Sequence, residues 1–134
     1  MSAVMMYLAT VVPFLIIDAA VVRLVMLPLF ERNVGPLLAE ETRLDVALGF
    51  YLFYVAGIVY FAVAPAAREG DAMLALQNGA ILGLLAYGTY EMTNMATLRG
   101  WSWTMVAADI TWGAIVTAGT AFIGLSIYRA FGGA

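Results

Sequence analysis

The stretch AMLALQNGAILGLLAYGTYEMTNMATL, residues 72–98, decides the fold because it is long and apolar enough to cross a lipid bilayer as one helix. A membrane-spanning helix needs about 20 predominantly apolar residues. Three other stretches meet this requirement, at roughly residues 4–27, 46–64 and 104–130. None of the four has the alternation of apolar and polar residues that is typical of barrel strands in membranes. We therefore expect four transmembrane helices.

The links between these stretches predict how the helices end and pack. Pro28 follows the first stretch and Pro65 follows the second, and we expect each proline to end its helix. The later links, at 65–71 and 99–103, are short, which makes neighbouring helices antiparallel. Gly79 and Gly83 form a small-xxx-small pattern that lets membrane helices approach closely. The predicted fold is all-α: one domain, residues 1–134, forming an integral membrane four-helix transmembrane bundle.

The composition supports a membrane protein and excludes several chemistries. Of the 134 residues, 64% are hydrophobic and 11% are charged, and the mean hydropathy is +0.95. Soluble domains are about 45–50% apolar and about 25% charged. The chain contains no cysteine and no histidine, which excludes disulfides, thiol nucleophiles, His–Cys zinc sites and His-ligated haem within it. We expect no cofactor and no bound metal. A net charge of −3 without a basic cluster argues against nucleic acid as a partner.

Three acidic residues lie inside the predicted spans, where a charged side chain is costly. An aspartate at the centre of a membrane helix costs roughly 2.5–3.5 kcal/mol. Counted along the sequence, Asp18, Glu91 and Asp109 lie about 13, 10 and 7–8 Å deep, at 1.5 Å per residue. All three depths are measured from the same membrane face, where the first and third links lie. Arg23 is the one basic residue in that region, and it can neutralise one acid at most.

The acids share their helix faces with aromatic and polar side chains. In the third span, two tyrosines, a glutamate and an asparagine recur at three- and four-residue steps, which places them on one helix face. Trp112 lies beside the face of Asp109, and Tyr54 enters its span from the same side of the membrane. We expect these residues to meet in one site, with Glu91 as the group that titrates. The predicted ligand-binding residues are Asp18, Tyr54, Tyr87, Tyr90, Glu91, Asn94, Asp109 and Trp112.

An alternative interpretation treats the same residues as ordinary features of membrane helices. Acids one or two turns inside a span act as helix caps or reach the headgroups, and Asp109 suits the positive end of its helix dipole. Trp101 and Trp103 are typical of the aromatic belt at a membrane interface. Tyr51 and Tyr54 have helix packing as their ordinary role. The interpretations differ in whether the acids meet in an enclosed site.

Several longer motifs carry a resemblance to a known family. The segments GFYLFYVAGIVYFAVAPA, GAILGLLAYGTYEMTNMATLRGW and ADITWG resemble the uncharacterised bacterial predicted membrane proteins of domain-of-unknown-function family 2177. The resemblance covers nearly the whole chain. It implies a multi-pass four-helix protein of the bacterial inner (cytoplasmic) membrane, and it supplies no activity. Aspartate is usual in the family where this chain has Glu91, which keeps the carboxylate and adds a methylene. The signature positions it implies are Asp18, Tyr54, Tyr87, Tyr90, Glu91, Thr93, Asn94, Trp101, Asp109, Trp112 and Gly113.

Three functions fit these observations. The first is binding or transport of a small cation or an amphiphile in a buried site with acidic and aromatic walls. Four helices are few for a transport path, so this function calls for a homodimer. The second is an accessory or assembly subunit of a larger membrane complex. The third is an enzyme that modifies a lipid or isoprenoid, with two carboxylates as acid and base or as ligands of magnesium.

The sequence also gives some evidence for choosing among these three functions. It contains no nucleophile motif and no aspartate-rich DDxxD-like motif of prenyl chemistry, so we lean against an enzyme. An enclosed, hydrated pocket would favour the first or third function, and a large outward-facing face that carries the signature residues would favour the second. The expected partners are membrane lipids and either a second copy of the chain or a larger membrane protein.

Overall fold

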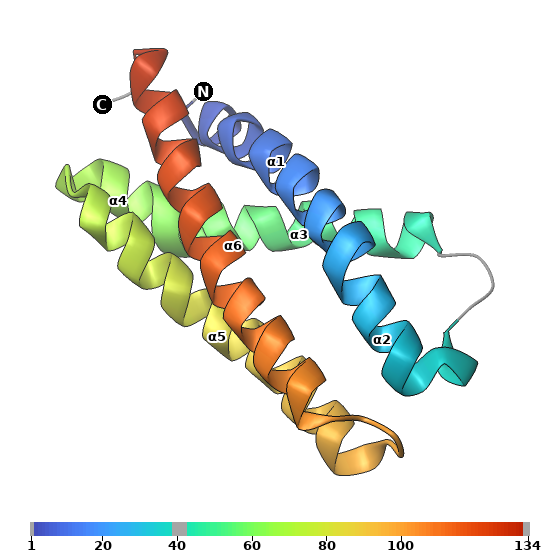
Figure 1. Cartoon of the computed structure of the whole chain (residues 1–134). Coiled ribbons are helices and arrows are strands. Elements are labelled where there is room, and N and C mark those ends of the chain that lie inside the picture. Colours follow the sequence, from blue (N-terminus) through green and yellow to red (C-terminus); the bar gives the residue numbers. More distant parts are fainter. Residues whose placement is uncertain (1, 39–42, 133–134) are drawn as a thin grey trace.

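The computed structural model describes residues 2–38 and 43–132, and these residues form helices with no strand among them (Figure 1). Within them, four helical stretches are long and apolar enough to cross a membrane. The chain is therefore an all-α membrane protein built as a four-helix transmembrane bundle, and this prediction is confirmed. The four stretches are Ala3–Leu37, Leu44–Glu69, Ala72–Thr97 and Trp103–Ala130.

The first two stretches are compound helices and the last two are uninterrupted. The first consists of α1 (Ser2–Val21), a π-helical turn (Val22–Met26), α2 (Leu27–Val34) and a 3-10 turn (Gly35–Leu37). The second consists of α3 (Leu44–Ile58), another π-helical turn (Val59–Val63) and α4 (Ala64–Glu69). The third and fourth are α5 (Ala72–Thr97) and α6 (Trp103–Ala130).

The helix ends predicted at Pro28 and Pro65 are wrong, because both helices continue past the proline. Pro28 is the second residue of α2 and Pro65 is the second residue of α4, and each follows directly on a π-helical turn. Proline has no backbone N–H and its ring clashes with the carbonyl four residues earlier. A π-helical turn widens the helix by one residue at that point, which makes room for the ring. Each proline therefore changes the local helix geometry without ending the helix.

One of the carbonyl groups freed by a proline finds a partner on another helix. Phe61 lies four residues before Pro65, and so its carbonyl has no backbone N–H to accept from at position 65. The side-chain amide of Asn78, on α5, donates to this carbonyl at 3.0 Å. Bonds of this kind are how proline is accommodated in membrane helices. Asn78 thereby joins α5 to the second π-helical turn.

Short capped turns connect the last three helices. Gly70 ends α4 with a left-handed backbone, φ 65°, which glycine adopts without strain. The Asp71 carboxylate then accepts from the Met73 N–H at 3.0 Å and caps α5. The Ser102 hydroxyl accepts from the Met105 N–H at 3.2 Å and caps α6. These turns make the neighbouring helices antiparallel.

The close pairing of α5 and α6 is the main helix contact of the bundle, and the two run side by side in Figure 1. A Cβ atom placed at Gly79 would lie 2.7 Å from the Cα atom of Ala118, closer than real contacts allow. A Cβ atom at Gly83 would overlap the backbone carbonyl of Gly113. The small residues predicted to allow close packing therefore do so, because the two backbones touch without side chains between them.

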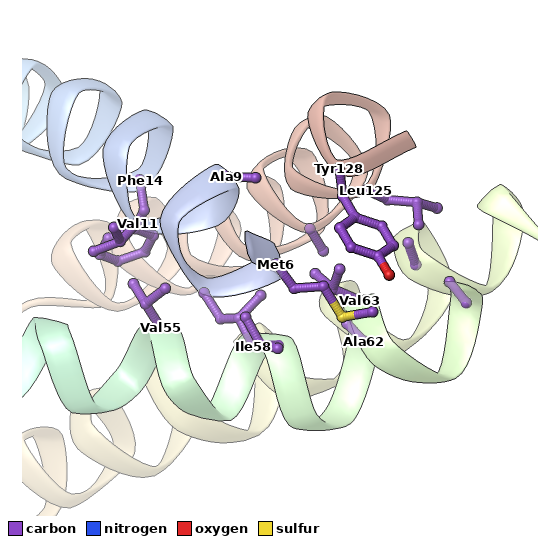
Figure 2. Close-up of a cluster of buried hydrophobic side chains, with 14 of the residues drawn as sticks. Met6, Ala9, Val11, Phe14, Val55, Ile58, Ala62, Val63, Leu125 and Tyr128 are labelled. Atoms are coloured by element: carbon purple, nitrogen blue, oxygen red, sulfur yellow. The ribbon is translucent and has the colours of Figure 1, made fainter. Parts of the chain in front are cut away.

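The apolar core lies in the half of the bundle near the two termini. Figure 2 shows this cluster between the helices: Phe14 of α1 lies beside Val55 of α3 at one side of it, and Leu125 of α6 lies at the other, and all three are buried. Nearby, Gly124 of α6 lies directly against Thr10 of α1. Away from this contact, α1 and α6 diverge toward α2, while α3 crosses the other helices (Figure 1). The bundle is closed at the termini and wider at the opposite end.

Replacing Gly83 by alanine is expected to destabilise the bundle, because the new methyl group has no room against the α6 backbone. Overpacking typically costs about 1–3 kcal/mol. The matched control is Gly88→Ala on the same helix, where nothing lies within 4 Å of the new methyl group. Thermal unfolding of both variants in detergent is the measurement. Equal midpoints for the two variants would contradict the proposed contact.

Asn78→Ala is expected to lower stability because it leaves the Phe61 carbonyl without its side-chain partner. Hydrogen bonds between membrane helices contribute about 0.6 kcal/mol on average and up to about 1.7 kcal/mol. The neighbouring Gln77 is exposed, so Gln77→Ala serves as the control and should change stability little. The free energy of unfolding, measured by SDS titration, distinguishes the two. If Gln77→Ala lowered the free energy of unfolding by as much, the loss in Asn78→Ala could not be assigned to the hydrogen bond with Phe61.

Candidate functional site

A cavity of about 680 Å³ lies where α1 and α2 diverge from α5 and α6. Its volume is within the usual range for sites that hold small molecules, about 300–1,000 Å³. Residues from every one of the four transmembrane stretches line it, and we refer to it as the acidic cavity. The lining residues are Asp18, Val22, Met26, Leu27, Phe30, Phe50, Tyr51, Tyr54, Ala86, Tyr87, Thr89, Tyr90, Asp109 and Trp112.

Asp18 is the carboxyl group of the cavity that is held by a hydrogen bond from another helix. It is 1% exposed, and its Oδ1 atom accepts a hydrogen bond from the indole N–H of Trp112 at 2.9 Å. This bond connects α1 to α6. The other oxygen, Oδ2, is buried and has no partner within hydrogen-bond distance among the described residues, and the Tyr51 hydroxyl is the polar group that faces the carboxyl group from α3. A buried polar atom without a partner is costly, and such atoms in native proteins call for an explanation.

Asp109 is the second carboxyl group that lines the cavity. It is 8% exposed and lies close enough to both Asp18 and Glu91 for their charges to interact. It follows the α6 cap, Ser102, by seven residues, which is about 10 Å along the helix. The interpretation of Asp109 as a helix cap is therefore wrong, since Ser102 fills that role.

Glu91 lies behind the cavity wall and is not one of the lining residues. It is 0% exposed, and its Oε1 atom accepts from the indole N–H of Trp101 at 2.8 Å. Its Oε2 atom is buried and has no hydrogen-bond partner among the described residues. The nearest acidic neighbour is Asp109, across the α5–α6 contact. The structure thus brings the three predicted acids together but leaves only Asp18 and Asp109 within reach of a molecule in the cavity.

The tyrosines form the wall between the acids and the apolar core. The Tyr54 hydroxyl shares a hydrogen bond of 2.8 Å with the Thr117 hydroxyl, and the Tyr54 ring packs edge-on against Tyr87 at 6.1 Å. Phe14 supports Tyr51 and Tyr54 from the core, with ring centroids 5.7 and 5.8 Å away. Tyr54, Tyr87, Tyr90 and Trp112 all line the cavity, as the helix faces predicted.

Asn94 does not line the cavity. Its backbone carbonyl accepts from the Leu98 N–H at 2.8 Å at the end of α5. Its place on the same helix face as Tyr87 and Tyr90 was predicted, but it lies one turn beyond the cavity toward the helix end.

Two aromatic residues, Tyr51 and Trp101, have roles in the structure that differ from those we inferred from the sequence. Tyr51, interpreted as helix packing, lines the cavity beside Asp18. Trp101, interpreted as part of an interfacial belt, is half-buried and donates to Glu91, whereas Trp103 is 62% exposed as a belt residue is. Trp101 also packs edge-on against Phe30 of α2 at 5.3 Å. The one signal that could have separated the two tryptophans was the family signature, which includes position 101.

The lining carries negative charge without a matching cation. None of the fourteen lining residues is basic, and Arg23, one position beyond the lining residue Val22, is exposed. Among the residues that the structure describes, no group of three or more His, Cys, Asp and Glu residues could hold a metal ion. The cavity therefore combines two carboxyl groups with a wall that is otherwise mostly aromatic and aliphatic.

The comparisons with known proteins identify the family and nothing finer. A family model described as "Predicted membrane protein (DUF2177)" matches residues 3–126. No curated protein and no solved structure matches the chain. The match covers α1 to α5 and most of α6, and so includes every residue of the acidic cavity.

Trp101→Phe is expected to destabilise the protein far more than Trp103→Phe. The first substitution keeps the ring against Phe30 but leaves the buried Glu91 carboxyl group without its donor, at a cost of about 1–3 kcal/mol. Trp103 is exposed, so the second substitution should change stability little. Thermal midpoints in nanodiscs are the measurement. Equal effects would show that the Trp101 indole N–H does not hold Glu91.

Proposed function

We propose that this chain, which belongs to the DUF2177 family of predicted membrane proteins, binds an amphiphilic organic cation in its acidic cavity. The observation that carries the proposal is Asp18: a buried carboxylate with one oxygen held by Trp112 and the other without a partner, in the wall of a 680 Å³ cavity. A positively charged group in the cavity would supply the partner that Oδ2 lacks.

The charge of the wall selects for a cation. Asp18 and Asp109 both line the cavity, and no lining residue is basic. In a low-dielectric site, opposite charges attract more strongly than in water, whereas an anion would meet like charge and no donor strong enough to offset it. The faces of tyrosine and tryptophan rings also attract cations. These two interactions act on the same ligand.

The remaining wall selects for an apolar body. Beside the carboxyl groups stand aliphatic and aromatic side chains such as Val22, Met26, Leu27, Phe30 and Phe50. A strongly hydrated ion such as sodium would find few oxygen ligands on this surface, whereas a molecule with an apolar body and one cationic group would satisfy both parts of it. The cavity is also large enough for such a molecule.

Transport of this ligand would require more than one copy of the chain. Four helices leave little room for an alternating path, so we propose that the protein acts as a homodimer or with a larger membrane-protein partner. The family resemblance favours the bacterial inner (cytoplasmic) membrane as the location. The polar residues gather inside the bundle, and this favours ligand binding over a role as an assembly subunit.

An enzyme acting on a lipid or isoprenoid is the weaker proposal. Acid–base chemistry needs two carboxyl groups with different tasks near the reacting atoms. Asp18 and Asp109 reach the cavity and could supply this pair, but the sequence contains no nucleophile motif and no DDxxD-like motif of prenyl chemistry.

Tetraphenylphosphonium is expected to bind the purified protein in nanodiscs, and tetraphenylborate, of the same shape and opposite charge, is not. Asp18→Asn should weaken the binding of tetraphenylphosphonium about 30-fold or more, because losing one partner of a buried charge pair costs about 2–5 kcal/mol. Isothermal titration calorimetry with each ion separately is the measurement.

The control for this experiment is Asp45→Asn, which removes an exposed acid at the start of α3. It removes one negative charge, as Asp18→Asn does, and should bind as the native protein does. Binding of tetraphenylborate as tight as that of tetraphenylphosphonium, or equal affinity in native protein and Asp18→Asn, would overturn the proposal.

A further inference from the structure

We propose that Asp109 releases a proton when the cation binds, so that the acidic cavity exchanges one proton for one organic cation. This inference rests on the proposed function and adds that the bound cation displaces a proton. Among the acids that the structure describes, Asp109 is the one that both lines the cavity and lies beside the buried Glu91. It is therefore placed to sense the ligand and a second carboxyl group at once.

The groups that face Asp109 from the described helices supply no positive charge. From α1 comes Asp18, from α3 come Tyr51 and Tyr54, and from α5 come Tyr87, Tyr90 and Glu91. All of these groups are either neutral or negative. Arg23 is exposed and is not among the lining residues.

Three carboxyl groups so close together cannot all carry a charge in an apolar site without a cation. Like charges at short distance in a low-dielectric medium repel strongly, and two neighbouring carboxyl groups commonly share one proton for this reason. Glu91 is held in place through its Oε1 atom by Trp101, and its Oε2 atom has no partner among the described residues. A proton on the Asp109 carboxyl group would provide a donor beside Glu91.

An arriving cation removes the need for that proton. In the exchange, the O–H bond of Asp109 breaks, its electron pair stays on the carboxylate oxygen, and the proton passes to water and then to buffer. The carboxylate gains one negative charge and the ligand brings one positive charge. The net charge of the cavity is therefore the same before and after, which is the electrostatic reason for a one-to-one exchange.

The proton has a short route to the membrane face. Asp109 lies about 10 Å along α6 from Ser102, and Glu91 lies about 9 Å from the end of α5. The link at residues 98–102 joins the end of α5 to the start of α6, and so Glu91 and Asp109 both lie near the aqueous phase at that end. Asp18 keeps its hydrogen bond to Trp112 and remains the carboxylate that binds the cation.

Calorimetry in two buffers tests this proposal. Tetraphenylphosphonium is titrated into the protein in phosphate and in Tris, whose ionisation enthalpies differ, and the difference in heat gives the number of protons released. We expect about one proton per cation in the native protein and in Asp45→Asn, and about none in Asp109→Asn. Binding without proton release in the native protein, or release that persists in Asp109→Asn, would overturn the exchange.

The outcomes separate this proposal from the proposed function. Tetraphenylphosphonium that binds without proton release leaves the cation site intact and overturns only the exchange. If tetraphenylphosphonium does not bind at all, the proposed function and the exchange both fail.

The pH dependence of binding in the native protein keeps the test decisive if Asp109→Asn does not fold. Release of one proton makes affinity rise with pH, by up to about tenfold per pH unit. Glu91→Gln keeps an acceptor for Trp101 but removes the carboxylate beside Asp109, so this slope should become shallower. A native affinity that is constant between about pH 5.5 and 8, within the range of roughly pH 5–8 where proteins tend to be most stable, would overturn the exchange.

Discussion

The close contact of α5 and α6 is the constraint on which the rest of the structure depends. Gly83 lies against the backbone of Gly113, and the ring of Tyr87 lies over Gly113, where a Cβ atom would overlap it. This arrangement fixes the rotation of both helices. Once the two backbones touch at these glycines, Glu91 and Asp109 face each other, and Tyr87 and Trp112 face the same cavity. A wider helix pair would separate the acids and fill the space between them with side chains.

Two tryptophans hold two buried acids in similar ways but with different consequences. Trp112 donates to Asp18 at 2.9 Å, and Trp101 donates to Glu91 at 2.8 Å. Each carboxyl group keeps a second oxygen without a partner among the described residues. The Asp18 bond joins α1 to α6 and leaves the carboxyl group in the cavity wall. The Glu91 bond joins α5 to the link before α6 and leaves the carboxyl group enclosed.

The π-helical turns shape the bundle where the prolines would otherwise break it. In the first compound helix, Val22 and Met26 of the turn and Leu27 after it all line the acidic cavity. Beyond the turn, α2 continues to Leu29 and Val34, which pack with Met105 of α6. The helix therefore carries one wall of the cavity and then closes its far end against α6. A helix that ended at Pro28 would leave that end without a wall.

The sequence by itself determined the class of protein, the number of spans and the small-residue contact. These features follow from hydropathy, helical periodicity and residue spacing, which are local properties of the chain. Only the tertiary structure decided that Pro28 and Pro65 lie inside helices, since a neighbour such as Asn78 supplies the missing hydrogen bond. It also decided that Glu91 lies behind the wall while Asp18 faces the cavity. The reason is that helix rotation and crossing, set by contacts between distant residues, determine which side of a helix meets a cavity and which meets its neighbour.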